Sequence, residues 1–381
     1  MSGEPSFFVP EPRLEAVQNR TPFALFRCDK MGVGRRFFDT VVVKGTFVLA
    51  PGPLRLADEQ DPIALADEPW DESAPERSSL RVAGDVVLTK PSTDVLVTGT
   101  ARAPSKASEW DVRVAVARGG SRSVDRRFRV TGPRSWVRRD GEWTLTDAEP
   151  TDAVPVRYEL AYGGAYVDEA QHTPEDDLSS PWVVHRPNPS GTGFVDERSL
   201  PDDAEVRAPQ WLDPKQWVDP AQGLDPDAGL AAPNAELALA GFGPIARPWA
   251  SRIGFAGTYD AAWLSRTRQE IERGLPPDYA ADFDPRFFQC AHPDLITKEH
   301  LRGDEEIALE GLTPGALTLR LPACRVLAHM LDGRNQAHEE RMPLDTVHVD
   351  LDRERVHLTW RLTLDQARDV RAAIVLATED A

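Results

Sequence analysis

The sequence is poor in cysteine. Its 381 residues include three, Cys28, Cys290 and Cys324, which lie far apart and form no CxxC pair. A disulfide framework or a zinc site needs cysteines at characteristic close spacings. The sequence therefore favours free, buried thiols in a reducing compartment.

Long apolar runs and a secretory signal are also absent. The sequence has no stretch of about eighteen apolar residues, the length that a membrane-spanning helix needs. Residues 1–17 lack the basic start and apolar core of a signal peptide. We expect a cytoplasmic protein with no membrane partner.

Positive charge is scarce relative to negative charge. There are 44 Lys and Arg residues against 62 Asp and Glu residues, which gives a net charge of −18. Nucleic acids and anionic membranes bind positive surfaces, so we expect no nucleic-acid partner. Residues 101–140 are nevertheless basic and residues 168–227 are acidic. Such stretches are typical of solvated faces, and they also fit contact with a charged partner.

Signatures of common catalytic and cofactor sites are missing. No glycine-rich phosphate loop opens a helix, the HExxH motif is absent, and the eight histidines are scattered. Ser190-Gly191-Thr192-Gly193 lacks the nucleophile of a GxSxG elbow. We therefore expect no catalytic residue, no cofactor and no metal, and predict that the protein is not an enzyme.

The chain does contain a series of strand patterns. Hydrophobic residues make up 41% and charged residues 28%, as in soluble globular proteins. Alternating or β-branched runs predict strands over residues 37–49, 79–88, 94–103, 112–116 and 124–130. Gly119-Gly120 and Asp140-Gly141 predict tight hairpins. These patterns predict a mainly β protein with an N-terminal antiparallel β-sandwich or open barrel.

The C-terminal part returns to strand patterns after an irregular middle. The strands predicted there cover residues 307–309, 316–321, 326–330, 346–351, 355–362 and 371–377. Asp332-Gly333 predicts a further hairpin turn. The result is a second, smaller antiparallel β unit.

These patterns divide the chain into five predicted parts. They are an N-terminal arm, an N-terminal β domain, a long Pro/Asp-rich loop region, an aromatic junction and a C-terminal β unit, over residues 1–22, 23–165, 166–240, 241–305 and 306–381. Trp182, Trp211 and Trp217 are spaced along the loop region, which indicates that it is pinned at intervals.

Aromatic residues are concentrated in the junction, between Phe242 and Phe288. Helical spacing predicts a helix near 259–273, with Thr258 as its N-cap and Gly274 as its end. The segment carries too much apolar area to lie free in water. It is either the packed centre between two β-rich halves or, in part, a groove for a partner.

Carboxylates in the junction leave a different function open. A glycoside hydrolase needs two carboxyl groups across a cleft that aromatic residues line. Asp260, Asp282, Asp284 and Asp304 lie in or near this Trp-rich region. An alternative is therefore a carbohydrate-active enzyme or a sugar-binding module that uses the Trp-rich middle.

The order of several motifs resembles a bacterial family. The motifs include Lys90-Pro91, Thr93-Asp94-Val95-Leu96-Val97, Tyr162-Gly163-Gly164, Gly241-Phe242-Gly243-Pro244, Ala256-Gly257-Thr258-Tyr259-Asp260, Phe287-Phe288 and Leu301-Arg302-Gly303-Asp304-Glu305. Over residues 20–365 their order resembles the family catalogued as domain of unknown function twenty-one sixty-nine. Members of that family lie beside type VI secretion genes that encode VgrG spikes and PAAR-like tips.

The resemblance implies a non-enzymatic adaptor or chaperone of a type VI secretion system. Such a protein would bind a PAAR-like tip protein or its effector, with VgrG as a further partner, and would assist loading onto the spike. It would work by covering apolar surface or sheet edges. A structural component of the secretion apparatus is a further alternative.

The predicted partner surface consists of the junction residues that carry the densest motifs. They are Tyr259, Asp260, Trp263, Phe287, Phe288, Arg302, Asp304 and Glu305. Within this set, we interpret residues 302–305 as a turn in which Arg302 pairs with a carboxylate.

Overall fold

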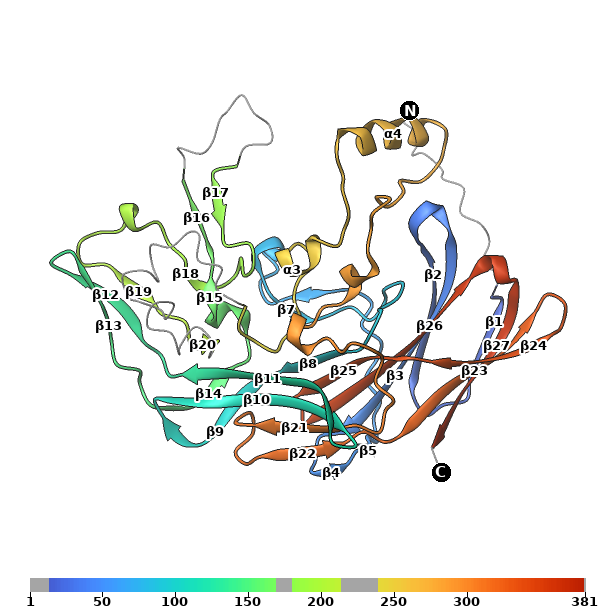
Figure 1. Cartoon of the computed structure of the whole chain (residues 1–381), viewed down its shortest axis with the longest axis horizontal. Helices are drawn as coiled ribbons and strands as arrows, with labels where there is room; N and C mark the ends of the chain where they lie inside the picture. Colours follow the sequence, from blue (N-terminus) through green and yellow to red (C-terminus); the bar gives the residue numbers. More distant parts are fainter. Residues whose placement is uncertain (1–13, 169–179, 214–238, 380–381) are drawn as a thin grey trace.

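The computed structural model is mainly β, as the sequence predicts (Figure 1). The structure describes residues 14–168, 180–213 and 239–379. Parts of the predicted arm and of the predicted loop region, with Trp217, lie outside the described residues. The predicted domain boundaries stay predictions.

Strands from both ends of the chain build the central sheet. Its order is β2-β3-β26-β25-β8, and β5 pairs with β3. β8 is parallel to β25, and the other pairs are antiparallel. The strands cover Ala24–Met31, Phe37–Val48, Arg355–Asp365, Leu344–Asp350, Asp94–Thr98 and Arg55–Leu56. The N-terminal and C-terminal strand patterns therefore share a sheet.

The central sheet is covered on both faces. Residues 39–47 of β3 are all buried, whereas a strand with one wet face alternates between buried and exposed side chains. Val41, Val43 and Phe47 belong to a core cluster that also contains Val112 and Phe128 of the next sheet. This shared core joins the two sheets.

Two further large sheets complete the core. One has the order β20-β11-β10-β21-β22-β4, over Trp211–Leu212, Ser121–Thr131, Glu109–Arg118, Glu306–Glu310, Leu317–Arg320 and Gly52–Pro53. The other has the order β1-β27-β23-β24, over Ala16–Asn19, Val370–Glu379, Cys324–Asp332 and Ala337–Met342.

Smaller sheets surround this core. They are β13-β12-β19, β14-β9, β15-β18, β16-β17 and β6-β7. In that order their strands cover Glu142–Leu145, Ser135–Arg139, Glu205–Arg207, Thr151–Pro155, Thr100–Ala107, Tyr162–Gly163, Thr192–Gly193, Ala165–Val167, Trp182–Val184, Glu68–Pro69 and Leu80–Val82. The three-stranded sheet lies at one end of the long axis and the four-stranded sheet at the other (Figure 1).

The three predicted hairpins are confirmed. Gly119 and Gly120 join β10 to β11, and Asp140 and Gly141 join β12 to β13. All four residues have positive φ, which the tight turn that matches strand twist requires. Asp332 ends β23 before the turn into β24, and its carboxylate accepts the N–H groups of residues 334 and 336.

Two predicted strands are wrong in extent. The strand predicted over 94–103 is split at Gly99, where φ is +100°. A Cβ there would lie 2.8 Å from the backbone nitrogen of Asp352, so the chain turns and continues as β9 in another sheet. Of the strand predicted over 79–88, β7 keeps three residues.

Short helices lie outside the sheets. The predicted helix is confirmed as α4, Ala261–Glu272, with Gly274 (φ +77°) just past its end. Its N-cap is Asp260, whose carboxylate accepts the N–H of Trp263, so the predicted cap Thr258 is wrong. The other helix in the described part of the chain is α3, Ala250–Ile253. The 3₁₀ turns among the described residues are Val33–Arg35, Pro75–Arg77, Tyr158–Leu160, Glu197–Ser199, Pro285–Phe288, Pro293–Leu295 and Gln366–Arg368.

A buried ion pair attaches the aromatic junction to the central sheet. Lys90 Nζ lies 2.8 Å from a carboxylate oxygen of Asp94, whose side chain is 0% exposed. The same oxygen accepts the backbone N–H of Cys290 at 2.9 Å, and Lys90 also donates to Thr346 of β25. Burial alone would lower the pKa of Lys90, but Asp94 and its other acidic neighbours raise it above its usual value. The ammonium is therefore charged.

Removing one partner of this pair should destabilise the fold strongly. We expect Lys90→Met to lower the free energy of unfolding by about 3–5 kcal/mol, because the Asp94 carboxylate then stays buried without its counter-ion. Urea denaturation measures the change. The control is Arg81→Met, which breaks the exposed pair with Glu68 and should cost about 0–1 kcal/mol. Equal losses of unfolding free energy in the two variants would show that the buried pair does not stabilise the fold.

Candidate functional site

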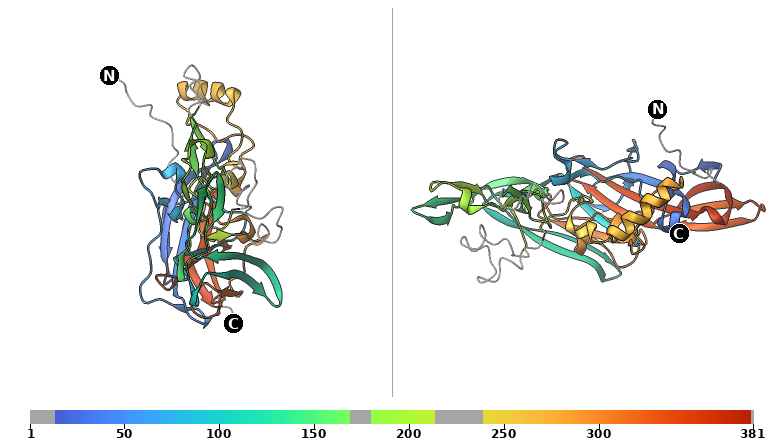
Figure 2. Two further views of the ribbon diagram at one scale, coloured as in Figure 1. Left: turned by 90° about the vertical axis from the view of Figure 1, so that its left-hand side faces the viewer. Right: turned by 90° about the horizontal axis from the view of Figure 1, so that it is seen from above.

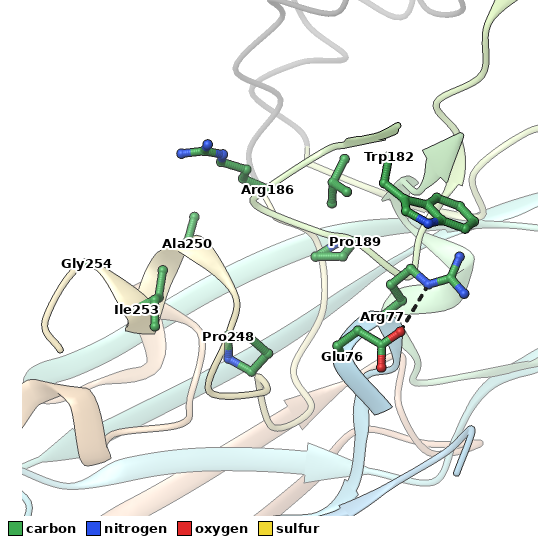
Figure 3. Close-up of a pocket in the computed structure, with 10 residues that line it drawn as sticks. Glu76, Arg77, Trp182, Arg186, Pro189, Pro248, Ala250, Ile253 and Gly254 are labelled. Carbon is green, nitrogen blue, oxygen red and sulfur yellow. Dashed lines mark ion pairs between the residues drawn. The ribbon is translucent and has the colours of Figure 1, made fainter. Parts of the chain in front are cut away.

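An open groove of about 690 Å³ lies beside α3. Its walls come from three stretches far apart in the sequence (Figure 3). The lining residues are Glu76, Arg77, Trp182, Val184, Arg186, Pro189, Pro248, Ala250, Ile253 and Gly254. Most of these side chains are apolar, although the groove faces water.

Trp182 and Arg77 form one wall. Trp182 opens β17 opposite Val167 of β16, and 42% of its surface is exposed. The Arg77 guanidinium lies 4.1 Å from the indole centroid, a favourable cation–π arrangement. Arg77 also lies 3.4 Å from Glu76. The Arg77 guanidinium therefore packs against the exposed ring.

Helix α3 forms the opposite wall, where Ile253 is 49% exposed. Beneath α3, Trp249 is fully buried. The buried guanidinium of Arg252 donates to the carbonyl oxygens of Ile245 at 2.7 Å and of Phe287 at 3.0 and 3.1 Å. The backbone N–H of Ala250 donates to the carbonyl of Arg186 across the groove at 3.2 Å. The wall is therefore fixed to the junction and to the 186–189 stretch.

The eight sequence-predicted partner residues lie in three separate places. Tyr259 and Trp263 pack edge to face at the start of α4, with ring centroids 4.7 Å apart, beside the capping Asp260. Tyr259 is exposed and Trp263 is half-buried. In two perpendicular views α4 stays at one extreme of the molecule (Figures 1 and 2). As a partner surface these three residues remain a prediction.

Phe287 and Phe288 belong to an aromatic cluster below α3. Their ring centroids lie 5.7 and 5.4 Å from that of Phe283, which in turn packs on Tyr279. Phe288 is buried and Phe287 is half-buried. The carbonyl of Phe287 binds Arg252, so this cluster supports the groove from beneath without lining it.

The third group forms the turn before β21. The Glu305 carboxylate is buried and accepts the backbone N–H groups of Arg302 at 2.7 Å and Gly303 at 2.8 Å. Asp304 pairs with Arg118 at 2.5 Å. The predicted internal ion pair is wrong, because backbone donors hold one carboxylate and a distant arginine holds the other.

None of the ten residues that line the groove is among the eight that the sequence singled out for binding. Trp182 is noted in the sequence only as an anchor of the loop region. The sequence does not show whether a given tryptophan is buried or exposed. The three stretches that line the groove are separated by more than fifty residues in the sequence, so no local signal could have identified it.

The chemically reactive side chains near the junction are either buried or bonded to neighbouring groups. Burial raises the pKa of the Cys290 thiol to about 12, against the opposing effect of Lys90, so the thiol is protonated and inert at neutral pH. Asp282 binds Thr258, and Asp284 binds Arg286. Within the described stretches no three His, Cys, Asp or Glu side chains are grouped so as to hold a metal ion.

His292 is buried with both ring nitrogens satisfied. Its Nε2–H donates to the carbonyl of Leu239 at 2.8 Å, and its Nδ1 accepts the N–H of Asp294 at 3.1 Å. Burial and the nearby Arg126 lower its pKa to about 4. A neutral imidazole whose two ring nitrogens both form hydrogen bonds with the backbone has a structural role.

Comparison with known proteins identifies a family. The chain matches the family described as uncharacterized protein conserved in bacteria (DUF2169) over residues 35–361. No curated protein and no solved structure matches the chain. Among the described residues no helix has the length and apolarity to span a bilayer. The family resemblance seen in the motifs is therefore confirmed.

Glu305 and Arg302 should differ in their effect on stability. We expect Glu305→Ala to cost about 1–3 kcal/mol, since it leaves two N–H groups without their acceptor. Arg302→Ala alters an exposed side chain and should change the free energy of unfolding by less than about 0.5 kcal/mol. Thermal and urea denaturation would measure both changes. An unchanged stability of Glu305→Ala would contradict the role given to this carboxylate.

Acid should weaken the fold through His292. The unfolded chain takes up a proton near the ordinary histidine pKa of 6.5, whereas folded His292 does so near 4. The free energy of unfolding should therefore fall as pH drops from about 6.5 to 4, by at most about 1.4 kcal/mol per pH unit for each such histidine. Denaturation of His292→Gln across this range should show a shallower slope than the parent. An identical slope would assign the acid sensitivity to other groups.

Proposed function

Because the chain belongs to the DUF2169 family of uncharacterized proteins conserved in bacteria, we propose that it is a non-enzymatic adaptor or chaperone of a type VI secretion system. It binds a PAAR-like tip protein or its effector and assists loading onto the VgrG spike. The observation that carries this proposal is the exposed apolar groove between Trp182 and Ile253.

The groove suits a partner segment rather than a reaction. It is open to solvent, and its centre is formed by Val184, Pro189, Pro248 and Ala250. Interface hot spots are aromatic or aliphatic anchors seated in such depressions. An apolar side chain of the partner fills the space between Trp182 and Ile253.

The sheet edge next to the groove has no partner strand among the described residues. There β17 pairs with β16 alone, and in our proposal its other edge takes an extended partner strand. Strand addition supplies main-chain hydrogen bonds, while a neighbouring pocket selects side chains. An extended partner segment along β17 would place its side chains in the groove.

Charge favours a partner segment with a carboxylate near its apolar anchor. Arg77 and Arg186 line the groove, although the protein as a whole carries a net charge of −18. A local positive site on a negative protein orients an acidic group without attracting nucleic acid. Glu76 balances Arg77 in the unbound groove.

The test is co-expression with the PAAR-like or effector protein encoded beside the gene, followed by affinity capture and size exclusion. We expect a stable complex, with the partner insoluble on its own. Trp182→Ala and Ile253→Asp should each weaken capture by about 30-fold or more, the loss of a hot-spot residue of about 2 kcal/mol. Both side chains are exposed, so neither substitution should change the melting temperature.

Two other variants define the surface. Trp263→Ala tests the predicted surface at α4, and Trp70→Ala removes an exposed tryptophan outside the groove. Loss of capture with Trp263→Ala and not with Trp182→Ala would move the interface to α4. A parent protein that elutes alone beside a soluble partner would refute the adaptor function.

A further inference from the structure

A second cavity, of about 860 Å³, lies between the stretch 61–70 and one face of the central sheet. Its floor carries Lys44 of β3, His357 of β26, His348 of β25 and Thr98 of β8. It shares no lining residue with the groove beside α3. We refer to it as the polar cleft. Its volume lies in the range of small-molecule sites, roughly 300–1,000 Å³.

The wall of the polar cleft is preorganised. The side-chain amide of Gln60 bonds to both the N–H and the carbonyl of Thr46, at 2.8 and 3.0 Å. The hydroxyl of Thr46 accepts the N–H of Asp61 at 2.9 Å. Three residues further on, Ala64 exchanges hydrogen bonds with Asp85. A ligand would therefore not have to order this wall, which lowers the entropic cost of binding.

Two histidines form the polar floor. His348 and His357 are cross-strand neighbours with ring centroids 5.4 Å apart. Nε2 of His348 lies 2.7 Å from the Thr98 hydroxyl, and Nε2 of His357 lies 2.7 Å from Asp61. Burial lowers the pKa of both imidazoles, so each is neutral at pH 7 and offers one donor and one acceptor.

One acceptor in the floor has no partner. His357 is 4% exposed, and its Nδ1 makes no hydrogen bond within the described part of the chain. Since Asp61 accepts at Nε2, the proton resides there and Nδ1 carries a lone pair. A buried polar atom without a hydrogen-bond partner destabilises the folded protein. A ligand hydroxyl that donates to this nitrogen would remove this destabilisation.

The charges of the polar cleft disfavour an anionic ligand. Its three cations are already paired: Lys44 with Asp85, Arg353 with Asp61, and Arg81 with Glu68, at 3.0, 2.8 and 2.7 Å. An anion would find no unpaired cation. The remaining carboxylates, Asp350 and Asp352, already accept the N–H of Arg353 and the hydroxyl of Thr100, and each keeps lone pairs that can accept a further hydroxyl.

An aromatic plate borders these polar groups. Trp70 lines the polar cleft and is 36% exposed, and the guanidinium of Arg157, which does not line it, lies 3.4 Å from the ring centroid. Pro62, Ile63 and Leu65 add apolar wall. A flat apolar plate beside many donors and acceptors matches a ligand with a C–H face and a rim of hydroxyls.

We propose that the polar cleft binds a neutral saccharide, whose ring lies against Trp70 while its hydroxyls bond to the floor of His348, His357 and Thr98 and to Asp350 and Asp352. The site lies away from the junction residues that the sequence associates with sugar binding. The proposal is independent of the adaptor function. It assigns recognition and no reaction.

Saturation-transfer NMR and isothermal titration on the full chain test the proposal. The probes are the neutral trisaccharides maltotriose, cellotriose and N-acetylchitotriose, with trigalacturonate as the anionic comparison and de-acetylated chitotriose as the cationic one. We expect saturable binding of at least one neutral probe in preference to both charged ones. Trp70→Ala should weaken it by about tenfold or more.

Trp182→Ala is the matched control, because it removes a similarly exposed tryptophan from the other site. It should leave saccharide binding unchanged, and Trp70→Ala should leave partner capture unchanged. No binding of any neutral probe at millimolar concentration would overturn the proposal. So would preference for a charged probe, or equal binding by Trp70→Ala. None of these results affects the adaptor function, which partner capture tests separately.

Discussion

The burial of Lys90 and Asp94 is the constraint on which the middle of the chain depends. A carboxylate that is 0% exposed needs a counter-ion and further donors. Asp94 obtains them from Lys90, four residues earlier, and from the backbone N–H of Cys290, almost two hundred residues later. Any other placement of the junction on the sheet would leave the carboxylate without its N–H donor. Buried pairs of this kind contribute less to net stability than to the choice of one arrangement over another.

Three consecutive hydrogen bonds connect the Lys90–Asp94 pair to the groove beside α3. Asp94 binds the N–H of Cys290 at 2.9 Å, the carbonyl of Cys290 binds the N–H of Ile245 at 2.7 Å, and the carbonyl of Ile245 binds the guanidinium of Arg252 at 2.7 Å. Arg252 belongs to α3, which carries Ile253 into the groove. An irregular segment must satisfy its backbone groups without the hydrogen-bond ladder of a sheet. Here the same bonds that satisfy these groups also position one wall of the proposed partner groove. They support the packed-centre interpretation of the junction, and the partner-groove interpretation remains a proposal.

The sequence predicts elements whose cause is local, and it fails where the cause is distant. Gly119-Gly120, Asp140-Gly141 and α4 follow from turn chemistry and helical spacing, which act within a few residues. The strand ends at Gly99 because the backbone of Asp352 lies too close for a side chain at that position. No residue near Gly99 in the sequence indicates this contact. The prediction of eight partner residues joined side chains that are close in sequence, whereas the structure distributes them over α4, the cluster below α3 and the turn before β21. A glutamate is expected at the surface, but Glu305 is buried because its carboxylate accepts two backbone N–H groups of its own turn.

One short loop forms part of both proposed sites. Trp70 lines the polar cleft and Arg77 lines the groove, and the N–H of Trp70 closes the loop between them on the carbonyl of Ser79 at 3.0 Å. Glu159 holds Ser79 by its N–H and hydroxyl at 3.0 and 2.8 Å, and the neighbouring Arg157 stacks on Trp70. A shared wall couples two sites only if it has two positions that the ligands bind differently. These contacts hold the loop on both sides, so we expect occupancy of the polar cleft to leave the groove unchanged. The two exposed tryptophans can therefore serve as independent controls for each other.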